Sequence, residues 1–585
     1  MQATMSISDV YNDLTLYITP EKFYLEPKTS EELLIIDRVS EDVTIQKNSG
    51  QIPAASTRQD FCGLLGSINL LAGRYLVVAT QRDLVGYIAG HPIWKLVKTE
   101  IIPYPKSLIH LNNEKQADNN VYLSMVQTVL ATPNFYFSYS YDITHSIQRL
   151  HDISPEFWQQ SLLERSDARF VWNANILEPF LAPSFRRFAL PLLLGFVSIN
   201  QCVINGQNFT WAIVSRRSIY RAGTRWFRRG IDQEGNVANF VETEQIVESG
   251  DGDRASFVQI RGSIPLFWYQ KPDLRYKPPI TLDYNIDPQE QRNACLKHIE
   301  SMAGIYGRQV MVDLVDQLGS EGLLEKAFRG TISLLAHPSV RYEPFDFHAE
   351  CRKMKWYRLS ILIDRVSLDQ DEMGYFLILR DGTLSSLQEG VFRTNCIDCL
   401  DRTNVVQSML AHRNLEIVLR RFAILSQDQT LEHQYSFESL YKNVWADHAD
   451  LVSIQYSGTG ALKTDFTRTG KRTKAGALQD GVNSLIRYYK NNFNDGFRQD
   501  SIDLFLGVGK VVSPIAPPPG WRYVTFPSVL LVATAMFVAS SVLPSEYSTE
   551  CLLYLLFWGG MMVATTHYIF RYGREFVDKP KLVGS

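Results

Sequence analysis

The sequence has few cysteines and almost no excess of charge, and each shortage excludes a class of protein. Seven cysteines in 585 residues are too few and too isolated for the disulfide framework of a small secreted protein. The 59 Lys and Arg residues nearly balance the 62 Asp and Glu residues, and a net charge of -3 argues against a protein that coats nucleic acid. We therefore expect a reducing compartment, with any basic site being local.

Two further features are missing. The first residues lack a basic stretch followed by an apolar core, which would mark a cleaved secretory signal, and the chain shows no repeat of fixed period. Hydrophobic residues nevertheless make up 45% of the chain, which excludes a largely disordered protein. At roughly 100–200 residues per domain, the length predicts two or three folded units.

Two apolar segments near the C-terminus, for which we predict helices at 524–543 and 551–571, contain uncharged runs at 526–543 and 551–570 apart from the titratable His567. As helices of roughly 18–20 uncharged residues they would each cover about 27–30 Å, the thickness of a hydrocarbon core. The segment 544–550 between them contains two Glu and no Lys or Arg, whereas basic residues flank the outer ends. The sequence therefore predicts a transmembrane hairpin with a lumenal loop at 544–550, a tail at 572–585 and both chain ends in the cytosol. Two buried core helices are the alternative.

The remaining chain divides by its hydrophobic pattern into two predicted domains and a linker. Residues 1–180 alternate short β-like runs with turn-rich stretches, which is typical of a strand-rich domain. Residues 181–506 combine strand patterns with longer helical ones, and 507–523 form a linker rich in Pro and Gly. The expected fold class is mixed α/β, with the strand-rich domain packed on an α/β catalytic domain. The helical patterns of the second domain cover 289–306, 403–425 and 479–493.

One short segment combines a nucleophile with a phosphate-binding pattern. Around it we expect a strand, a tight loop and a helix, and five residues separate Cys396 from Arg402. Such a loop surrounds a phosphate with backbone N–H groups, to which the N-terminus of the helix adds a partial positive charge. These groups stabilise a thiolate that attacks phosphorus, while the guanidinium binds two phosphate oxygens. We predict a phosphatase in which Thr403 binds the sulfur or caps the helix.

The pair Cys396 and Cys399 allows two other interpretations. Zinc would need two more ligands at metal spacing, and no second Cys pair is present, so no metal or other cofactor is predicted. A thioredoxin-like redox role is disfavoured because Asp398 and Asp401 oppose thiolate formation. A reversible disulfide that protects the nucleophile from over-oxidation is a separate hypothesis.

The two carboxylates of the loop need a role, because anions beside a phosphate are unfavourable unless they are protonated or hydrogen-bonded. We predict that Asp398, with a pKa raised by the bound phosphate, donates a proton to the leaving oxygen. Asp401 is favoured as a structural residue that bonds loop amides or the helix N-terminus. Asp447 and Asp450 are alternative acids.

A basic segment at 458–474 contains five basic residues and one acid. We predict that it forms a cationic rim that binds an inositol phosphate headgroup and anionic lipid, with a solvated loop as the alternative. A Walker loop is not supported, because Asp465 stands where that motif has glycine. The residues assigned to the rim are Lys463, Arg468, Lys471 and Arg472.

A second basic cluster lies between residues 216 and 229, interleaved with aromatic residues. We interpret it as the exposed edge of strands, and nucleic-acid binding is disfavoured. Its members are Arg216, Arg217, Arg221, Arg225, Arg228 and Arg229.

The motif RTNCIDCLDRTN at 393–404 resembles the signature of the Sac-domain phosphoinositide phosphatases. The resemblance covers most of the chain, including RFALPLLLGFVSIN (187–200), ASFVQIRGSIPLFW (255–268) and the two-span C-terminus. It implies metal-free removal of phosphate from phosphatidylinositol 4-phosphate, and to a lesser extent from the 3-phosphate. Cys396 would be the nucleophile and Arg402 the phosphate ligand.

The same resemblance implies the membranes of the endoplasmic reticulum and Golgi, and allows protein partners at membrane contact sites. Two features depart from the family: His448 stands where the family pattern has Asn, and the C-terminus lacks a dilysine signal. The main rival is a non-catalytic phosphoinositide-binding tether, which the presence of both Cys396 and Arg402 disfavours. A protein tyrosine phosphatase is disfavoured by the membrane anchor.

Overall fold

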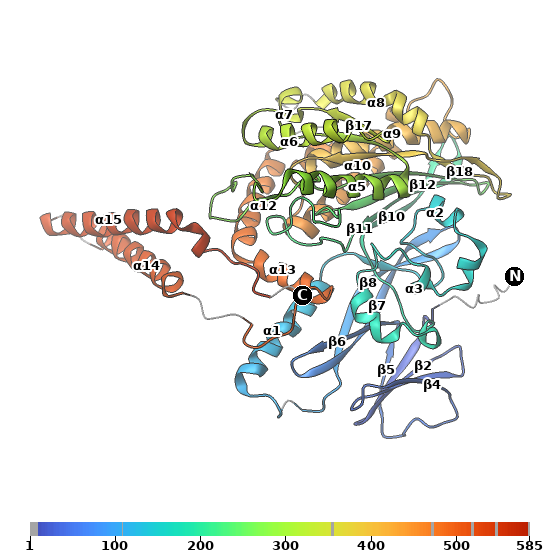
Figure 1. Cartoon of the computed structure of the whole chain (residues 1–585), viewed down its shortest axis with the longest axis horizontal. Coiled ribbons are helices and arrows are strands. Elements are labelled where there is room, and N and C mark those ends of the chain that lie inside the picture. Colours follow the sequence, from blue (N-terminus) through green and yellow to red (C-terminus); the bar gives the residue numbers. More distant parts are fainter. Residues whose placement is uncertain are drawn as a thin grey trace.

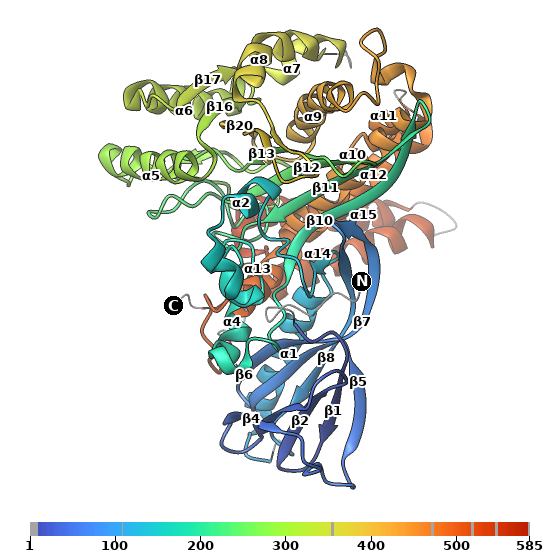
Figure 2. The same cartoon turned by 90° about the vertical axis from the view of Figure 1, so that its right-hand side faces the viewer.

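The computed structural model describes residues 10–107, 109–352, 356–469, 473–515, 520–543 and 548–582. A five-stranded sheet lies at one end of the molecule and a helix-covered part of a larger sheet at the other, while a helical hairpin projects sideways (Figure 1, Figure 2). The architecture is the mixed α/β fold that the hydrophobic pattern predicts.

The small sheet is antiparallel, with the strand order β4-β3-β2-β1-β5. Apolar side chains such as Leu16, Phe23 and Leu34 are buried from one face against Leu76 and Val78 of the larger sheet. The other face is covered in part as well, where Tyr24, Leu33 and Ile35 form a smaller cluster, so the middle strands are buried almost continuously. The strands are β1 (Leu14–Ile18), β2 (Lys22–Pro27), β3 (Glu32–Asp37), β4 (Val43–Lys47) and β5 (Thr57–Phe61).

The larger sheet has thirteen strands and continues across residue 180, where we predict the domain boundary. Its main path runs β17-β16-β20-β13-β12-β11-β10-β9-β8-β7-β6, with β18 paired to β13 and to β19. The boundary at 180 stays a prediction. The strands are β6 (Gly63–Leu70), β7 (Gly73–Ile88), β8 (His91–Pro103), β9 (Phe135–Phe137), β10 (Leu193–Ile204), β11 (Gln207–Arg217), β12 (Val241–Ser249), β13 (Arg254–Arg261), β16 (Arg308–Asp313), β17 (Val340–Pro344), β18 (Phe376–Ile378), β19 (Leu384–Ser386) and β20 (Gly390–Asn395), beside the separate pair β14 (Trp268–Tyr269) and β15 (Thr281–Leu282).

The only parallel pairings among the described strands join β13, β20, β16 and β17. Helices cover both faces of this part, because Met311 packs with α5 (Pro288–Tyr306) and α6 (Gly319–Leu335), whereas its neighbours on β16 pack with α8 (Leu359–Met373) and α9 (Asp401–Arg421). Burial on both faces accounts for the continuous apolar run of β16. The other helices of the two domains are α1 (Asn113–Leu130), α2 (Ile147–His151), α3 (Leu162–Arg165), α4 (Ala174–Leu177), α7 (Phe347–Glu350), α10 (Tyr435–Ser457), α11 (Thr464–Thr469), α12 (Lys474–Phe493) and α13 (Asp495–Phe505).

The helical patterns predicted at 289–306, 403–425 and 479–493 correspond to α5, α9 and α12. Helix α12 begins five residues before the predicted start, because the hydroxyl of Thr473 accepts a hydrogen bond from the backbone N–H of Gly476 and caps the helix there.

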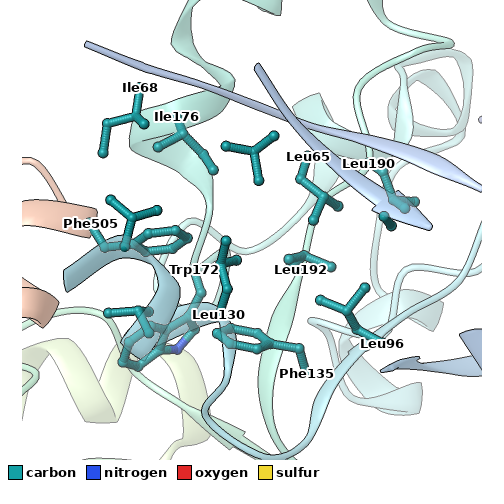
Figure 3. Packing of buried hydrophobic residues seen from close by; sticks show 14 of the residues in the cluster. Leu65, Ile68, Leu96, Leu130, Phe135, Trp172, Ile176, Leu190, Leu192 and Phe505 are labelled. Atoms are coloured by element: carbon teal, nitrogen blue, oxygen red, sulfur yellow. The ribbon is translucent and has the colours of Figure 1, made fainter. Parts of the chain in front are cut away.

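Helix α13 is anchored at its C-terminal end in the core of the N-terminal region. Phe505 is fully buried and packs near Trp172, Ile68 and Ile176 (Figure 3). A residue from the end of the catalytic region thus belongs to the same hydrophobic cluster as strands and helices from the beginning of the chain. The two regions are therefore packed together through apolar contacts.

The apolar runs form α14 (Trp521–Val542) and α15 (Thr549–Arg571), which lie side by side and project from the body of the molecule (Figure 1). Both are long and apolar enough to cross a membrane, and only 6% of each candidate span is buried. The rings of Phe526 and Tyr568 stack with their centroids 4.0 Å apart at the base of the hairpin. The buried-core alternative for these helices is therefore wrong.

The chain after α15 packs back on the catalytic region. Phe576 and Val577 are buried with Leu274. The carboxylate of Asp578 accepts a hydrogen bond of 2.8 Å from the N–H of Phe497, in the first turn of α13. Because the residue that precedes α13 offers no side-chain cap, Asp578 supplies the cap from the tail.

Candidate active site

The Cys-x5-Arg segment has the predicted order of strand, loop and helix. Strand β20 is entirely buried between β16 and β13, and its residues run directly into the loop that begins at Cys396. Helix α9 follows at Asp401, two residues before the predicted start, and no side chain caps it at Leu400. The loop therefore lies at the carboxyl ends of parallel strands and at a helix N-terminus, the position where open α/β sheets bind anionic ligands.

The sulfur of Cys396 is buried in the loop and hydrogen-bonded. The hydroxyl of Thr403 lies 3.4 Å from it, which is the contact predicted for Thr403. Burial by itself would raise the pKa of the Cys396 thiol, but hydrogen bonds from Cys399 and Thr403 oppose that effect. Together with the positive charge of Arg402 they lower the pKa from 9.0 to about 6, so the thiolate predominates at neutral pH.

Cys399 serves as a hydrogen-bond partner of the first cysteine. Its pKa is raised well above 9.0, first by burial and then by its contact with Cys396, so it remains a protonated donor. Its sulfur also lies 2.9 Å from the carbonyl oxygen of Gly262. Both cysteines are free thiols, and the protective disulfide stays a prediction.

Arg402 is held by acidic residues from the segment after β16. Its guanidinium donates hydrogen bonds of 3.0 Å to Oε2 of Glu321 and 3.0 Å to the carbonyl oxygen of Leu314, and it lies 3.3 Å from Asp316. Burial opposes the charge, but the carboxylate of Glu321 and the thiolate of Cys396 raise the pKa of Arg402 above its ordinary value. The cation is thus fixed beside the loop.

Asp398 of the loop forms ion pairs with two arginines from a distant segment. Its carboxylate accepts hydrogen bonds of 2.7 Å from Arg225 and 2.6 Å from Arg229. Burial alone would raise the pKa of Asp398, but these two guanidinium groups hold it well below 3.8. Two arginines distant in sequence thus neutralise the carboxylate and act against the raised pKa that we predict with a bound phosphate, and the acid role of Asp398 stays a prediction.

The pKa of Asp401 is shifted in the opposite direction from that of Asp398. Burial is the main cause that raises the pKa of its carboxyl group above 3.8. It lines the same cavity as Cys396 and accepts a hydrogen bond of 3.2 Å from the N–H of Leu462, a structural contact with a loop amide. The alternative acids Asp447 and Asp450 pair with Arg468, and neither is among the described residues that line the cavity.

A cavity of about 760 Å³ opens over the loop. Its walls combine the reactive loop with cations from several distant segments, which suits a ligand of multiple negative charge. Sequence reasoning missed most of these cations as cavity residues, because they come from separate segments of the chain that meet only in the fold. The basic residues that line the cavity are Arg225, Lys277, Arg352, Arg402, Lys463 and Arg487.

Only part of the predicted cationic rim lies at the cavity. Lys463 lines it. Arg468 instead donates a hydrogen bond of 2.6 Å to Asp447 and lies 3.4 Å from Asp450, and it is not among the described residues that line the cavity, so its headgroup contact stays a prediction. Lys471 and Arg472 lie outside the described residues.

The interpretation of the second arginine cluster as an exposed strand edge is wrong for its main members. Arg216, Arg217 and Arg229 are buried. Arg216 binds Glu242 at 2.8 Å and Glu244 at 2.6 Å on the adjacent strand β12. Because buried guanidinium groups need acidic or carbonyl partners, these arginines connect the sheet and the reactive loop.

His448, which departs from the family pattern, contacts the first turn of α9. Its Nδ1 lies 2.8 Å from Oδ1 of Asn404, and its Nε2 lies 2.7 Å from the hydroxyl of Ser215. Burial, followed by the charges of Arg261 and Arg217, lowers the pKa of His448 well below 6.5. The ring is therefore neutral at physiological pH and adds no titration there.

The fold and the cavity define an α/β protein with a thiolate and cations at the carboxyl ends of the parallel strands in a mixed sheet. A family model described as the SacI homology domain matches residues 62–352. The chain is 52% identical to the phosphatidylinositol-3-phosphatase SAC1 of Drosophila melanogaster, over 98% of this chain and 97% of that protein. It is 48% identical to SAC1-B of Danio rerio, over 99% of both chains.

A more distant relative also matches most of the chain. The phosphatidylinositol-3-phosphatase SAC1 of Saccharomyces cerevisiae is 36% identical over 91% of this chain and 87% of that protein. The chain therefore belongs to the Sac family of phosphoinositide phosphatases. It is a phosphoinositide phosphatase with two candidate membrane-spanning helices, and the non-catalytic tether is not favoured.

Proposed function

We propose that this chain hydrolyses phosphatidylinositol 4-phosphate, and the 3-phosphate to a lesser extent, through a cysteinyl-phosphate on Cys396. The main support is the thiol of Cys396, whose pKa is lowered to about 6 at the base of a cation-lined cavity. A nucleophile that is ionised at neutral pH, beside fixed cations, fits attack on a phosphate monoester. The order of the two isomers rests on the family resemblance.

In the first step, the sulfur of Cys396 forms a bond to phosphorus while the bond from phosphorus to the inositol oxygen breaks. Asp401 gives its proton to that oxygen, because its raised pKa favours the protonated acid. In the second step, water attacks phosphorus and the sulfur leaves as a thiolate. Asp401 takes the proton of the water, which restores the enzyme and releases inorganic phosphate.

The basic residues of the cavity bind different parts of the substrate. Arg402 binds the oxygens of the transferred phosphate, since its planar group follows their charge as it changes in the transition state. Asp398 stays ionised and holds Arg225 at the cavity. Lys463 and Arg487, which also line the cavity, bind the remaining phosphate of the headgroup.

The substrate side of the molecule lies on the cytosolic face of the membrane. Basic residues flank the outer ends of α14 and α15, and the positive-inside rule then places both chain ends in the cytosol. The family resemblance supports the endoplasmic reticulum and Golgi as the membranes, with an anionic lipid surface and proteins of membrane contact sites as partners.

The test uses the full-length protein in mixed micelles, with each singly phosphorylated phosphatidylinositol and a phosphotyrosine peptide as substrates. We expect release of phosphate to be fastest from the 4-phosphate and to be abolished in Cys396→Ser. Release from the peptide alone would identify a protein tyrosine phosphatase. Binding of the lipids by the wild type without release would identify a tether.

A further inference from the structure

Helix α12 separates the cavity from an uncovered surface. Its residues Ser484, Arg487, Tyr488 and Asn491 line the cavity above the reactive loop. Arg487 also donates a hydrogen bond of 2.8 Å to the hydroxyl of Thr459, which fixes the helix on the catalytic region. This face of α12 thus both lines the cavity and holds the helix on the catalytic region.

The opposite face of α12 is apolar and exposed. Its six side chains follow spacings of three, four and seven residues, which places them within an arc of roughly 100° on a helix. None of the described residues from 478 to 493 that are exposed has a charge. The six are Leu478 (72% exposed), Val482 (42%), Leu485 (72%), Ile486 (43%), Tyr489 (61%) and Phe493 (39%).

This apolar face continues into the surface of the membrane hairpin. Phe493, at the end of α12, lines the same apolar groove as Leu530 and Leu531 of α14 and Phe576 of the tail. In Figure 1, α12 lies on the side of the molecule from which the hairpin projects, and it runs across the direction of α14 and α15. When the hairpin spans a bilayer, α12 therefore lies along the surface of that bilayer.

We propose that α12 is an interfacial helix, and that its apolar face enters the surface of the same bilayer that the hairpin spans. An amphipathic helix that lies in the membrane plane needs an apolar stripe without charges, and it gains free energy for each apolar side chain removed from water. The exposed Lys474 at the start of α12 is placed to meet anionic headgroups.

The proposal rests on the proposed function and explains how the cavity reaches its substrate. With one face of α12 in the bilayer and the other lining the cavity, about one helix diameter, roughly 10 Å, separates the lipid surface from the reactive loop. An inositol headgroup extends from the membrane while its acyl chains stay in place. The position of α12 thus favours lipid in the protein's own membrane.

The test compares leucines of equal exposure on different faces. Leu478 and Leu485 on α12 and Leu334 on α6 are each 72% exposed, so Leu334→Asp controls for the loss of an exposed leucine. The full-length variants are reconstituted in phosphatidylcholine vesicles that contain phosphatidylinositol 4-phosphate, and are also assayed with the water-soluble dibutanoyl analogue. We expect Leu478→Asp and Leu485→Asp to lower the rate on vesicles about tenfold, a difference of about 1.4 kcal/mol, without changing the rate on the soluble analogue.

Several outcomes would overturn the proposal. If both α12 variants match Leu334→Asp on vesicles, the face does not enter the bilayer. A diazirine amino acid at position 485 of the reconstituted protein should form adducts with lipid, and adducts with a second protein chain would instead identify a protein interface. If the wild type hydrolyses neither substrate, the proposed function fails, and the diazirine result still decides where α12 lies.

Discussion

Arg229 donates a hydrogen bond of 2.6 Å to Oδ1 of Asp398, and the side chain of Arg229 is only 2% exposed. Arg225 binds the other oxygen of the same carboxylate at 2.7 Å. One carboxylate therefore balances two guanidinium groups beside the reactive cysteine. Removal of either partner would destabilise the protein, because the ion that remains would be buried away from water without a counter-charge.

The first prediction concerns this double ion pair. Asp398→Asn should lower the free energy of unfolding by about 3 kcal/mol, because it leaves Arg229 buried without a counter-charge. Thermal unfolding of the full-length protein in detergent measures the loss. The exposed Asp364 on α8 provides the control, since Asp364→Asn should leave the midpoint unchanged. Equal midpoints for the two variants would show that the pairs do not stabilise the fold.

Asp401 provides the second prediction. Asp401→Asn should lower kcat by roughly 10²–10⁴-fold on phosphatidylinositol 4-phosphate, whose alkoxide leaving group needs a proton. The loss should be much smaller on p-nitrophenyl phosphate, because that leaving group is stable without protonation. Asp398→Asn should reduce both rates by the same factor. A loss that is larger on the lipid for Asp398→Asn than for Asp401→Asn would exchange the roles of the two residues.

The third prediction concerns the thiolate. The second-order rate of alkylation of Cys396 should rise with pH through about 6 and then level, because the pKa of the thiol is lowered to that value. Thr403→Ala removes a hydrogen bond to the sulfur and should move the midpoint to higher pH. Inactivation by iodoacetamide, with inorganic phosphate as the protecting ligand, measures both midpoints. An unchanged midpoint in Thr403→Ala would remove Thr403 from the stabilisation of the thiolate.

Asp313 gives a prediction about the pH dependence of stability. Burial raises the pKa of its carboxyl group to about 7, although it accepts a hydrogen bond of 2.6 Å from Asn395 just before the reactive loop. The folded state thus binds a proton more tightly than the unfolded state, so this group favours unfolding increasingly as the pH rises from about 4 to 7.

Replacement of Asp313 by Asn removes that titration. The unfolding midpoint of the wild type relative to Asp313→Asn should therefore fall between pH 5 and pH 7.5, and thermal unfolding at a series of pH values measures the difference. A constant difference across this range would mean that Asp313 does not titrate there. The neighbouring Asp316 supplies a control whose pKa is shifted in the opposite direction. Its contacts with His348 and Arg402 lower the pKa of its carboxyl group against the effect of burial.

The fifth prediction concerns the tail. Asp578→Ala should destabilise the first turn of α13 by about 1 kcal/mol, because it removes the acceptor of the Phe497 N–H. Hydrogen exchange of the peptide around Phe497 should become faster, while Lys579→Ala should leave it unchanged. Exchange that stays slow in Asp578→Ala would show that another group caps α13.

The sequence by itself determined the features that depend on neighbouring residues. The strand, loop and helix around Cys396 follow from local hydrophobic periodicity, and Thr403 reaches the sulfur because it stands at a fixed place in the first turn of α9. The helices α14 and α15 follow from two uninterrupted apolar runs. Each of these features is set within one short segment, so its residues specify it without knowledge of distant partners.

Tertiary structure decided which ionised groups meet. Arg229 and Asp398 are 169 residues apart, and only the packing of the sheet against the loop brings them together. The spacing of the arginines from 216 to 229 contains no information about their acidic partners, so the same pattern fits an exposed strand edge. Two arginines lower the pKa of Asp398 against the effect of burial, whereas burial raises the pKa of Asp401, because the pKa of a carboxyl group depends on its solvation and on charges a few ångströms away.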